Sequence, residues 1–332
     1  MISLTRGDPV AKCVEGRYKG EIICIDKSKE AKIDLWAKPE FIIKEMLYKD
    51  PDYMILTRRT KPQKKARLEY LIEQEEDTPE GLEMIENDTE GLRDIYDRSM
   101  KILERIYKKE LFIPDAVFEP YIDEDRHETY YITGQSGSGK STYATNLIKM
   151  MRKKNPNKKV YIISKLDEDK VYDEIGKGPN APIRIPTKDD EGFDAFGMTK
   201  DHIPSLTMDH LKDSIVVFDD TTSIDDPAIN KGVQHLLDTI CECGRHNKIT
   251  LINTAHLIAN HKASRKILNE STNITFFINS NWAQTSLFFK GQMGMLKPQI
   301  ERIRLLGEGS RWITLNRGIP NYILSQNRLL LI

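Results

Sequence analysis

The sequence contains few cysteines. Its 332 residues include four, at positions 13, 24, 241 and 243, and no two of them form a C-x-x-C pair. A disulfide-stabilised scaffold would be denser in cysteine, so the count indicates a reducing compartment. A zinc site could be sought among Cys241, Cys243, His246 and His256. However, C-x-C on a helix points its two sulfurs to different faces, which favours ordinary thiols over metal ligands.

The sequence also lacks long apolar runs. No segment reaches membrane-spanning length, and the N-terminus carries Arg6, Asp8, Lys12 and Glu15 where a signal peptide would be apolar. We therefore expect neither a transmembrane helix nor a signal peptide. Hydrophobic residues at 39% and charged residues at 30% are typical of a globular protein, and the length favours two domains.

One glycine-rich stretch dominates the sequence. Residues 134–141, Gly-Gln-Ser-Gly-Ser-Gly-Lys-Ser, match G-x-x-x-x-G-K-[ST] and follow a strand-like run over 129–133. The pattern predicts a phosphate-binding P-loop, in which Lys140 contacts the β- and γ-phosphates and Ser141 ligates Mg²⁺. A helix over 140–154 would add its positive end to the same site. The predicted nucleotide contacts are Gly134, Gln135, Ser136, Gly137, Ser138, Gly139, Lys140, Ser141 and Thr142.

Buried strands and helices alternate after this stretch. The runs over 159–164, 182–185, 214–218, 249–254 and 274–278 are apolar and strand-like. Continuous apolar runs separated by helical segments are typical of a mainly parallel sheet that is covered on both faces. In such sheets ligands bind at the carboxyl ends of the strands, where the P-loop lies.

Polar side chains follow two of these strands. The run over 214–218 ends in Asp219 and Asp220, which matches the Walker B pattern. We expect Asp219 to join Ser141 in the Mg²⁺ shell, and Asp220 to orient the attacking water. Thr254 ends another strand, and its hydroxyl would lie near the γ-phosphate if that strand neighbours the P-loop strand.

Charge is unevenly distributed along the chain. The net charge is −1, yet residues 244–332 hold 12 lysines and arginines against three glutamates, so this part carries +9 and the remaining 243 residues carry −10. Such asymmetry favours a polyanionic partner such as DNA, although solvated charges on ordinary helices give the same count.

Residues 1–125 are predicted to form a smaller α+β accessory domain, and residues 126–332 the P-loop domain with its basic C-terminal part. The first begins with a β-hairpin over 11–18 and 21–26 and continues into acidic, helical sequence over 68–107. A basic stretch over 58–67 is a DNA-contacting loop, a nuclear-import signal or an exposed linker. Prolines and the acidic run at 123–125 place the boundary near residue 125.

Four motifs together resemble a known family. They are G-Q-S-G-S-G-K-S, I-V-V-F-D-D, C-G-R-H-N-K-I-T-L-I-N-T-A-H and the tail S-R-W-I-T-L-N-R-G-I-P-N-Y-I-L. Residues 128–332 resemble the genome-packaging ATPases of nucleocytoplasmic large DNA viruses, which are poxvirus-type members of the FtsK/HerA division of P-loop motors. Motors of this division usually carry Glu after the Walker B aspartate, where this sequence has Asp220.

The resemblance implies a five-stranded core with the fourth strand inserted between the P-loop and Walker B strands. It further implies a homo-oligomeric ring of five or six subunits that uses ATP and Mg²⁺ to translocate double-stranded DNA into a capsid. Capsid or portal components would be partners, and the protein would act in the host cytoplasm, in viral factories, and in the virion.

Arg245 is the predicted arginine finger. It follows a helix that ends near Gly244 and precedes the strand that carries Thr254, an edge position from which it would face the neighbouring subunit's γ-phosphate. In the alternative interpretation Arg245 caps its own helix by pairing with the last carbonyls, and Arg265 is the arginine finger instead.

Two other functions remain open from the residues alone. A small-molecule P-loop kinase would share the phosphate loop, but would more often be a compact single domain with an arginine-rich lid. A nucleotide-gated DNA-binding switch would bind ATP without significant turnover.

Overall fold

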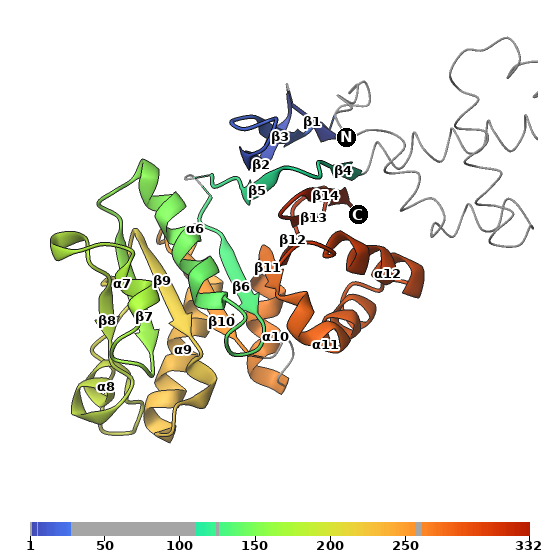
Figure 1. Ribbon diagram of the computed structural model, residues 1–332. Coiled ribbons are helices and arrows are strands. Elements are labelled where there is room, and N and C mark those ends of the chain that lie inside the picture. Colours follow the sequence, from blue (N-terminus) through green and yellow to red (C-terminus); the bar gives the residue numbers. More distant parts are fainter. Residues whose placement is uncertain (1, 5, 28–109, 124–125, 257–260) are drawn as a thin grey trace, which may run out of the picture. The chain divides into compact units, whose positions relative to one another are not determined.

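The computed structural model describes residues 2–4, 6–27, 110–123, 126–256 and 261–332 (Figure 1). The basic stretch over 58–67 and the acidic helices over 68–107 lie outside these ranges. The chain forms two compact units: unit 1 comprises residues 1–121, 296–306 and 323–332, and unit 2 comprises residues 122–295 and 307–322. None of the described helices is both long and apolar enough to cross a membrane.

Unit 2 is built on a mainly parallel sheet. Its strands lie in the order β12-β11-β6-β10-β9-β7-β8. Their bounds are β6 Thr129–Thr133, β7 Lys159–Ser164, β8 Ile183–Ile185, β9 Ser214–Asp219, β10 Thr250–Ala255, β11 Asn273–Phe276 and β12 Ile313–Asn316. Strands β11, β6, β10, β9, β7 and β8 are parallel to their neighbours, and β12 is antiparallel to β11. The strand β10 therefore lies between the P-loop strand β6 and the Walker B strand β9, as the family resemblance predicts.

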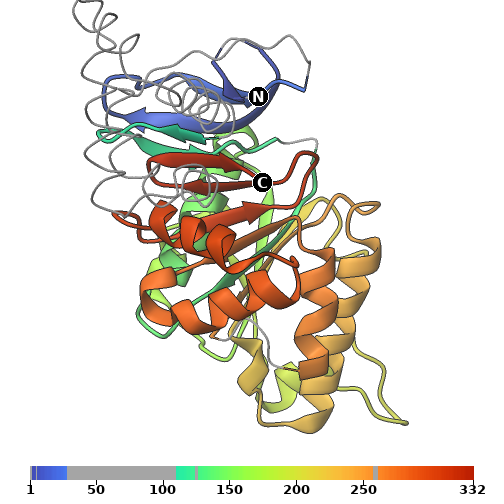
Figure 2. The ribbon, with the colours of Figure 1, turned by 90° about the vertical axis from the view of Figure 1, so that its right-hand side faces the viewer.

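Helices cover both faces of this sheet. Their bounds are α6 Lys140–Lys154, α7 Lys170–Asp173, α8 Asp189–Phe196, α9 Pro227–Cys243, α10 His261–Glu270 and α11 Ile278–Gly291, with 3₁₀ turns η2 Gly178–Asn180 and η3 Thr221–Ser223. The chain passes from β6 to β7 in one direction across the sheet and from β9 to β10 in the other. Since parallel crossovers are right-handed, α6 lies on one face and α9 on the opposite face beside α10 (Figures 1 and 2).

The helix α9 shows how local sequence sets these contacts. Asp226 caps its N-terminus by accepting from the N–H groups of residues 228 and 229, and Pro227 occupies the first helical position. Its buried stripe faces the sheet. At Gly232 a Cβ atom would lie 1.6 Å from the carbonyl oxygen of Phe196 at the end of α8. Only glycine therefore allows α8 and α9 to approach this closely.

Unit 1 contains an antiparallel sheet in the order β1-β3-β2-β5, which includes the predicted N-terminal hairpin as β2 and β3. The bounds are β1 Ile2–Ser3, β2 Asp8–Glu15, β3 Ile22–Ile25, β4 Glu110–Phe112, β5 Val117–Pro120, α12 Lys297–Leu306, β13 Tyr322–Ser325 and β14 Arg328–Leu331. The C-terminal strand β14 pairs with β4, so Arg328 lies opposite Phe112. The segments 296–306 and 323–332, which the sequence assigns to the P-loop domain, thus group with unit 1.

One strand prediction needs correction. The run over 274–278 was expected to remain extended, but β11 ends at Phe276 and α11 begins at Ile278. Phe276, Phe288 and Phe289 form an aromatic cluster with ring centroids 5.2 to 5.6 Å apart. This packing favours an early helix start, because it brings Phe288 and Phe289 of α11 back onto the end of the strand.

Candidate nucleotide-binding site

The glycine-rich stretch forms a loop between β6 and α6 at the carboxyl end of the sheet. Gly137 and Gly139 adopt positive φ angles of 74° and 105°, a region that favours glycine. Residues 140–142 begin α6, where N–H groups lack acceptors within the helix. The Ser138 hydroxyl oxygen is buried and has no hydrogen-bond partner. The loop therefore offers donors and a helix N-terminus to an anion, which fits a nucleotide phosphate.

The ammonium group of Lys140 is buried within this loop. Its Nζ atom donates to the carbonyl oxygens of Gly134 at 3.0 Å and Gln135 at 3.3 Å. It also lies 4.0 Å from Oδ2 of Asp220 and 3.4 Å from Nδ1 of His256. Lys140 is thus held at the mouth of the loop, with a carboxylate and an imidazole as its side-chain neighbours.

The carboxylate of Asp219 lies at the end of β9, and two hydroxyl groups donate to one of its oxygens. Oδ1 accepts from Thr254 Oγ1 at 2.7 Å and from the Tyr172 hydroxyl at 2.8 Å. No described residue donates to the other oxygen, Oδ2. Burial raises the pKa of the Asp219 carboxyl, and these two hydrogen bonds oppose that rise by favouring the charged form.

Asp219 and Ser141 are the predicted Mg²⁺ ligands, and their surroundings fit that ion. Both offer oxygen ligands, which Mg²⁺ prefers, and among the described residues the two donors to Asp219 both bind Oδ1 and leave Oδ2 to other partners. Burial raises the pKa of the Tyr172 phenol well above its usual value, and the nearby Ser141 hydroxyl opposes that rise, so both predicted ligands neighbour one phenol.

Asp220 lies at the mouth of the loop rather than in the core. Its backbone is left-handed, with φ 49°, and its N–H donates to Thr254 Oγ1 at 3.2 Å. Its Oδ2 lies 3.0 Å from Nε2 of His256. Because the Lys140 ammonium can only donate, Nδ1 of His256 accepts, and Nε2 is then the ring atom that carries a proton toward Asp220. The imidazole thus links Lys140 to Asp220.

The structure places the predicted residues as follows. Thr254 lies on the strand next to the P-loop strand and is 1% exposed. Its hydroxyl donates to the Asp219 carboxylate and accepts from the backbone N–H of Asp220, so it orients Asp219 rather than pointing at open solvent. Sequence reasoning missed His256 and Tyr172 as members of the site. His256 had a signal, since it stands two residues after Thr254 at the end of a strand. Tyr172 had none, because α7 is a four-residue helix.

Arg311 also reaches the P-loop, although its sequence position marks it only as one of the basic residues of the C-terminal part. A Cβ atom on Gly139 would lie 3.4 Å from Nη2 of Arg311 and 3.5 Å from the Phe277 ring. Lys140, Arg311 and the N-terminus of α6 bring positive charge together, which favours a polyanionic ligand.

Arg245 lies at the opposite end of the strands from its own P-loop. It follows Gly244, the C-cap of α9, and precedes β10, whereas the P-loop follows the carboxyl end of β6. The last carbonyls of α9 accept from other groups: Ile240 O from Gly244 N at 2.7 Å, and Cys243 O from Asn247 Nδ2 at 3.1 Å. No carbonyl of the described residues accepts from the Arg245 side chain, so the helix-cap alternative has no hydrogen bond there to support it. The side chain of Arg265 lies outside the described residues.

Several basic residues of the C-terminal part are engaged within the protein. Arg302 lies 3.3 Å from the buried carboxylate of Glu110, and Arg328 stacks on Phe112 with its guanidinium carbon 3.9 Å from the ring centroid. Arg317 donates to the Leu268 carbonyl at 2.6 Å. Only part of the +9 charge of residues 244–332 is therefore available to bind a polyanion.

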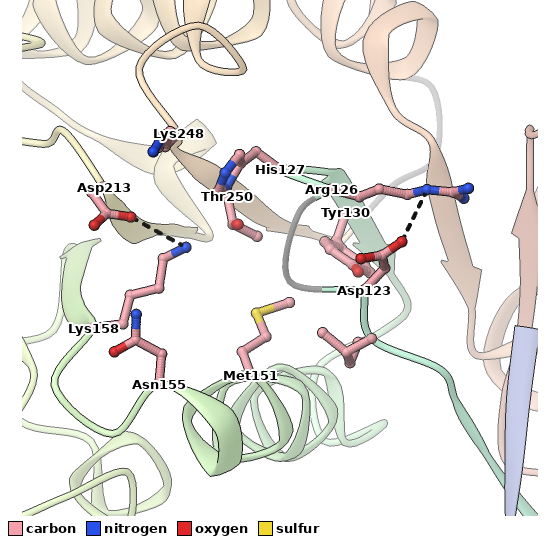
Figure 3. Close-up of a pocket in the computed structure, with 11 residues that line it drawn as sticks. Asp123, Arg126, His127, Tyr130, Met151, Asn155, Lys158, Asp213, Lys248 and Thr250 are labelled. Carbon is pink, nitrogen blue, oxygen red and sulfur yellow. Dashed lines mark ion pairs between the residues drawn. The ribbon is translucent and has the colours of Figure 1, made fainter. Parts of the chain in front are cut away.

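A hollow of about 200 Å³ lies at the opposite, amino ends of the strands (Figure 3). It is bordered by Tyr130 near the start of β6 and Thr250 at the start of β10. Its two carboxylates are paired, Asp213 with Lys158 at 3.8 Å and Asp123 with Arg126 at 3.3 Å. This hollow is distinct from the P-loop.

The fold and the site together define a P-loop NTPase fold with an additional strand between the phosphate-binding strand and the strand that ends in two aspartates. No family model matches the chain. The chain is 36% identical over 223 residues to the uncharacterized protein V3 of the Sputnik virophage, a match that spans 66% of this chain and 83% of V3. It belongs to the family of that virophage protein.

Solved structures similar to this chain include viral and bacterial ATPases. The genome packaging NTPase B204 of Sulfolobus turreted icosahedral virus 2, in complex with AMPPCP, is 13% identical with a TM-score of 0.40, covering 62% of this chain and 99% of B204. The conjugation coupling protein TcpA of pCW3, with ATPγS, is 13% identical with a TM-score of 0.37, covering 66% of this chain and 62% of TcpA. EssC of Geobacillus thermodenitrificans is 14% identical with a TM-score of 0.36, covering 67% of this chain and 43% of EssC.

Proposed function

We propose that this protein is an ATP-hydrolysing motor that translocates double-stranded viral DNA into a capsid. The observation that carries the proposal is the arrangement around β10: the P-loop lies on one side of this strand, and Asp219 and Asp220 lie on the other. A phosphate-binding loop facing two carboxylates is suited to hydrolysis of a nucleoside triphosphate. The relationship to a virophage protein supports a viral setting, and the sequence motifs support a poxvirus-type packaging ATPase.

In this proposal each residue has a chemical role. The Lys140 ammonium leaves the carbonyl oxygens of Gly134 and Gln135 and stabilises charge on the γ-phosphoryl group. Asp220 orients the attacking water and accepts its proton. His256 contacts both Asp220 and Lys140 and so fixes their positions relative to each other. Bound Mg²⁺, held by Ser141 and through Asp219, would neutralise charge on the β- and γ-phosphates.

The remaining parts of the proposal concern partners. The protein assembles into a homo-oligomeric ring of five or six copies, in which Arg245 reaches the γ-phosphate of the neighbouring copy. It acts on double-stranded DNA together with capsid or portal components, in the host cytoplasm and in the virion. This assignment requires a second copy of the protein, because Arg245 precedes the amino end of β10 and lies too far from its own P-loop to act within one chain.

The decisive experiment measures ATP hydrolysis with and without long double-stranded DNA. Stimulation by DNA supports the motor, phosphate transfer to a metabolite would support a small-molecule kinase, and tight ATP binding without turnover would support a nucleotide-gated switch. Lys140→Ala serves as the inactive control. Turnover that ignores DNA of every length would contradict the motor.

DNA binding itself is tested by its salt dependence. Contacts to phosphates predict an affinity that falls steeply with salt and depends little on sequence. Arg302 is a poor probe, since its reversal would set two carboxylates together at buried Glu110. Lys290 and Lys297 are exposed, and reversing each would reduce the salt slope by about one if each contacts a phosphate. If the salt dependence of DNA affinity is unchanged in both variants, the phosphate contacts must be made by other residues.

A further inference from the structure

We infer that Tyr172 is a positioning residue that organises the Mg²⁺ ligands of this site. The inference rests on the proposed function and deepens it. The phenol of Tyr172 is fully buried at 0% exposure and donates to Oδ1 of Asp219 at 2.8 Å. The Ser141 hydroxyl is a near neighbour of the same phenol. One side chain therefore lies against both the last residue of the P-loop and the Walker B carboxylate.

The direction of the hydrogen bonds explains what the phenol does. Its proton is donated to Asp219, so the lone pairs of its oxygen can only accept, and the Ser141 hydroxyl is the nearby group that can donate to them. When Ser141 directs its proton to Tyr172, a lone pair of its oxygen is left to ligate a cation. Because Thr254 and Tyr172 both donate to Oδ1, the carboxylate of Asp219 is fixed in rotation with Oδ2 available.

The position of Tyr172 is itself fixed from several sides. Asp169 caps α7 by accepting from the N–H of Val171 at 2.8 Å. Arg184 of β8 donates to the Asp169 carbonyl at 3.1 Å and to the Asp173 carboxylate at 2.7 Å. Thr145 of α6 donates to the Val171 carbonyl at 3.3 Å. A phenol held by a capped and bracketed helix is preorganised, which is what a residue that orients metal ligands requires.

The test replaces Tyr172 by Phe, which keeps the ring and removes only the hydroxyl. The matched control is Tyr161→Phe, since Tyr161 is a buried residue of β7 whose hydroxyl donates to the carbonyl of His210, outside the site, at 2.9 Å. For each protein, binding of a fluorescent ATP analogue is measured in EDTA and then across a Mg²⁺ titration. Melting temperatures establish that both variants are folded.

We expect Tyr172→Phe to weaken the apparent Mg²⁺ affinity of the nucleotide complex by about 10- to 100-fold, as is usual when a partner of a metal ligand is lost. Nucleotide binding in EDTA should match that of the wild type, and Tyr161→Phe should leave the Mg²⁺ titration unchanged. In a Thr254→Val background, loss of the Tyr172 hydroxyl should cost more than it does alone, because Oδ1 then has no donor.

Equal Mg²⁺ affinities in Tyr172→Phe and the wild type would overturn the inference and leave Tyr172 as a packing residue. An equal loss in the two tyrosine variants would also overturn it, since the effect would then be one of general stability. A wild-type protein whose nucleotide binding ignores Mg²⁺ would instead contradict the proposed function.

Discussion

Arg245 gives the most demanding prediction, because the structure limits what this side chain can reach. The P-loop follows the carboxyl end of β6, and Arg245 precedes the amino end of its parallel neighbour β10. The six residues of β10 separate these two edges by about 20 Å, at roughly 3.3 Å per residue. An arginine side chain is much shorter than this separation. If Arg245 contacts a γ-phosphate, that phosphate must therefore be bound to another copy of the protein.

Arg245→Ala should bind ATP normally and hydrolyse it about 10³-fold more slowly, which is the usual effect of removing an arginine finger. The fold should be unaffected, because the guanidinium is exposed and no described residue accepts from it. The matched control is Lys248→Asn, which removes an exposed cation from the same turn. Lys248 has φ 57°, a left-handed conformation that asparagine tolerates well. This control should hydrolyse ATP at the wild-type rate.

Mixing experiments then separate action between copies from action within one. In equal mixtures of Arg245→Ala and Lys140→Ala subunits, about a quarter of the head-to-tail interfaces join an intact P-loop to an intact Arg245. ATPase activity should recover to about that fraction, although each variant alone is inactive. Co-assembly shown by mass photometry without any recovery would refute the assignment, and the same mixture made with Arg265→Ala would then test the alternative finger.

Three further predictions concern single side chains. Lys140→Ala should retain its fold and lose at least about 10²-fold in turnover, and a purified variant that keeps more than about a tenth of wild-type activity would remove the basis for the P-loop assignment. Asp219→Asn should weaken Mg²⁺-dependent nucleotide binding and turnover together, whereas Asp220→Asn should bind Mg·ATP and lose mainly the chemical step; equal loss of binding in both variants would contradict this division. Burial raises the pKa of Cys241 to about 12, so at pH 8 only about one thiol in 10⁴ is ionised. Iodoacetamide should therefore modify exposed Cys243 first, as mass spectrometry of tryptic peptides would show.

Sequence alone predicted the parts of the fold that depend on local patterns. The bounds of β6, α6 and β7 match the predicted 129–133, 140–154 and 159–164, because each is a continuous apolar run or helical stripe with clear limits. The inserted position of β10 came from the family resemblance, since strand order is set by contacts far apart in sequence. The pairing of β14 with β4 places Arg328 opposite Phe112, more than 200 residues away in the sequence. No local sequence pattern predicts this pairing.

Local sequence patterns likewise predict some residues of the site and not others. The loop glycines and the paired aspartates were predictable because phosphate and metal chemistry restricts the residue types and their spacing. Tyr172 and Arg311 were not, because each reaches the site from an element whose sequence carries no chemical pattern. Gly244 was predicted as the end of α9, and it is, but with a right-handed φ of −57°. The residue is glycine because a Cβ atom would lie 2.4 Å from the Ile240 carbonyl oxygen, while Lys248 takes the left-handed position.

Four groups of the protein surround the Lys140 ammonium. An ammonium group at a helix N-terminus is unfavourable by its interaction with the helix dipole. Here the cost is offset by the Gly134 and Gln135 carbonyl oxygens, by the imidazole of His256 and by the Asp220 carboxylate 4.0 Å away. A bound phosphate would compete for the same ammonium and release Asp220 and His256 from it together. In the proposed function Asp220 orients the attacking water, so phosphate binding at Lys140 and the release of Asp220 toward that water would be coupled through one contact.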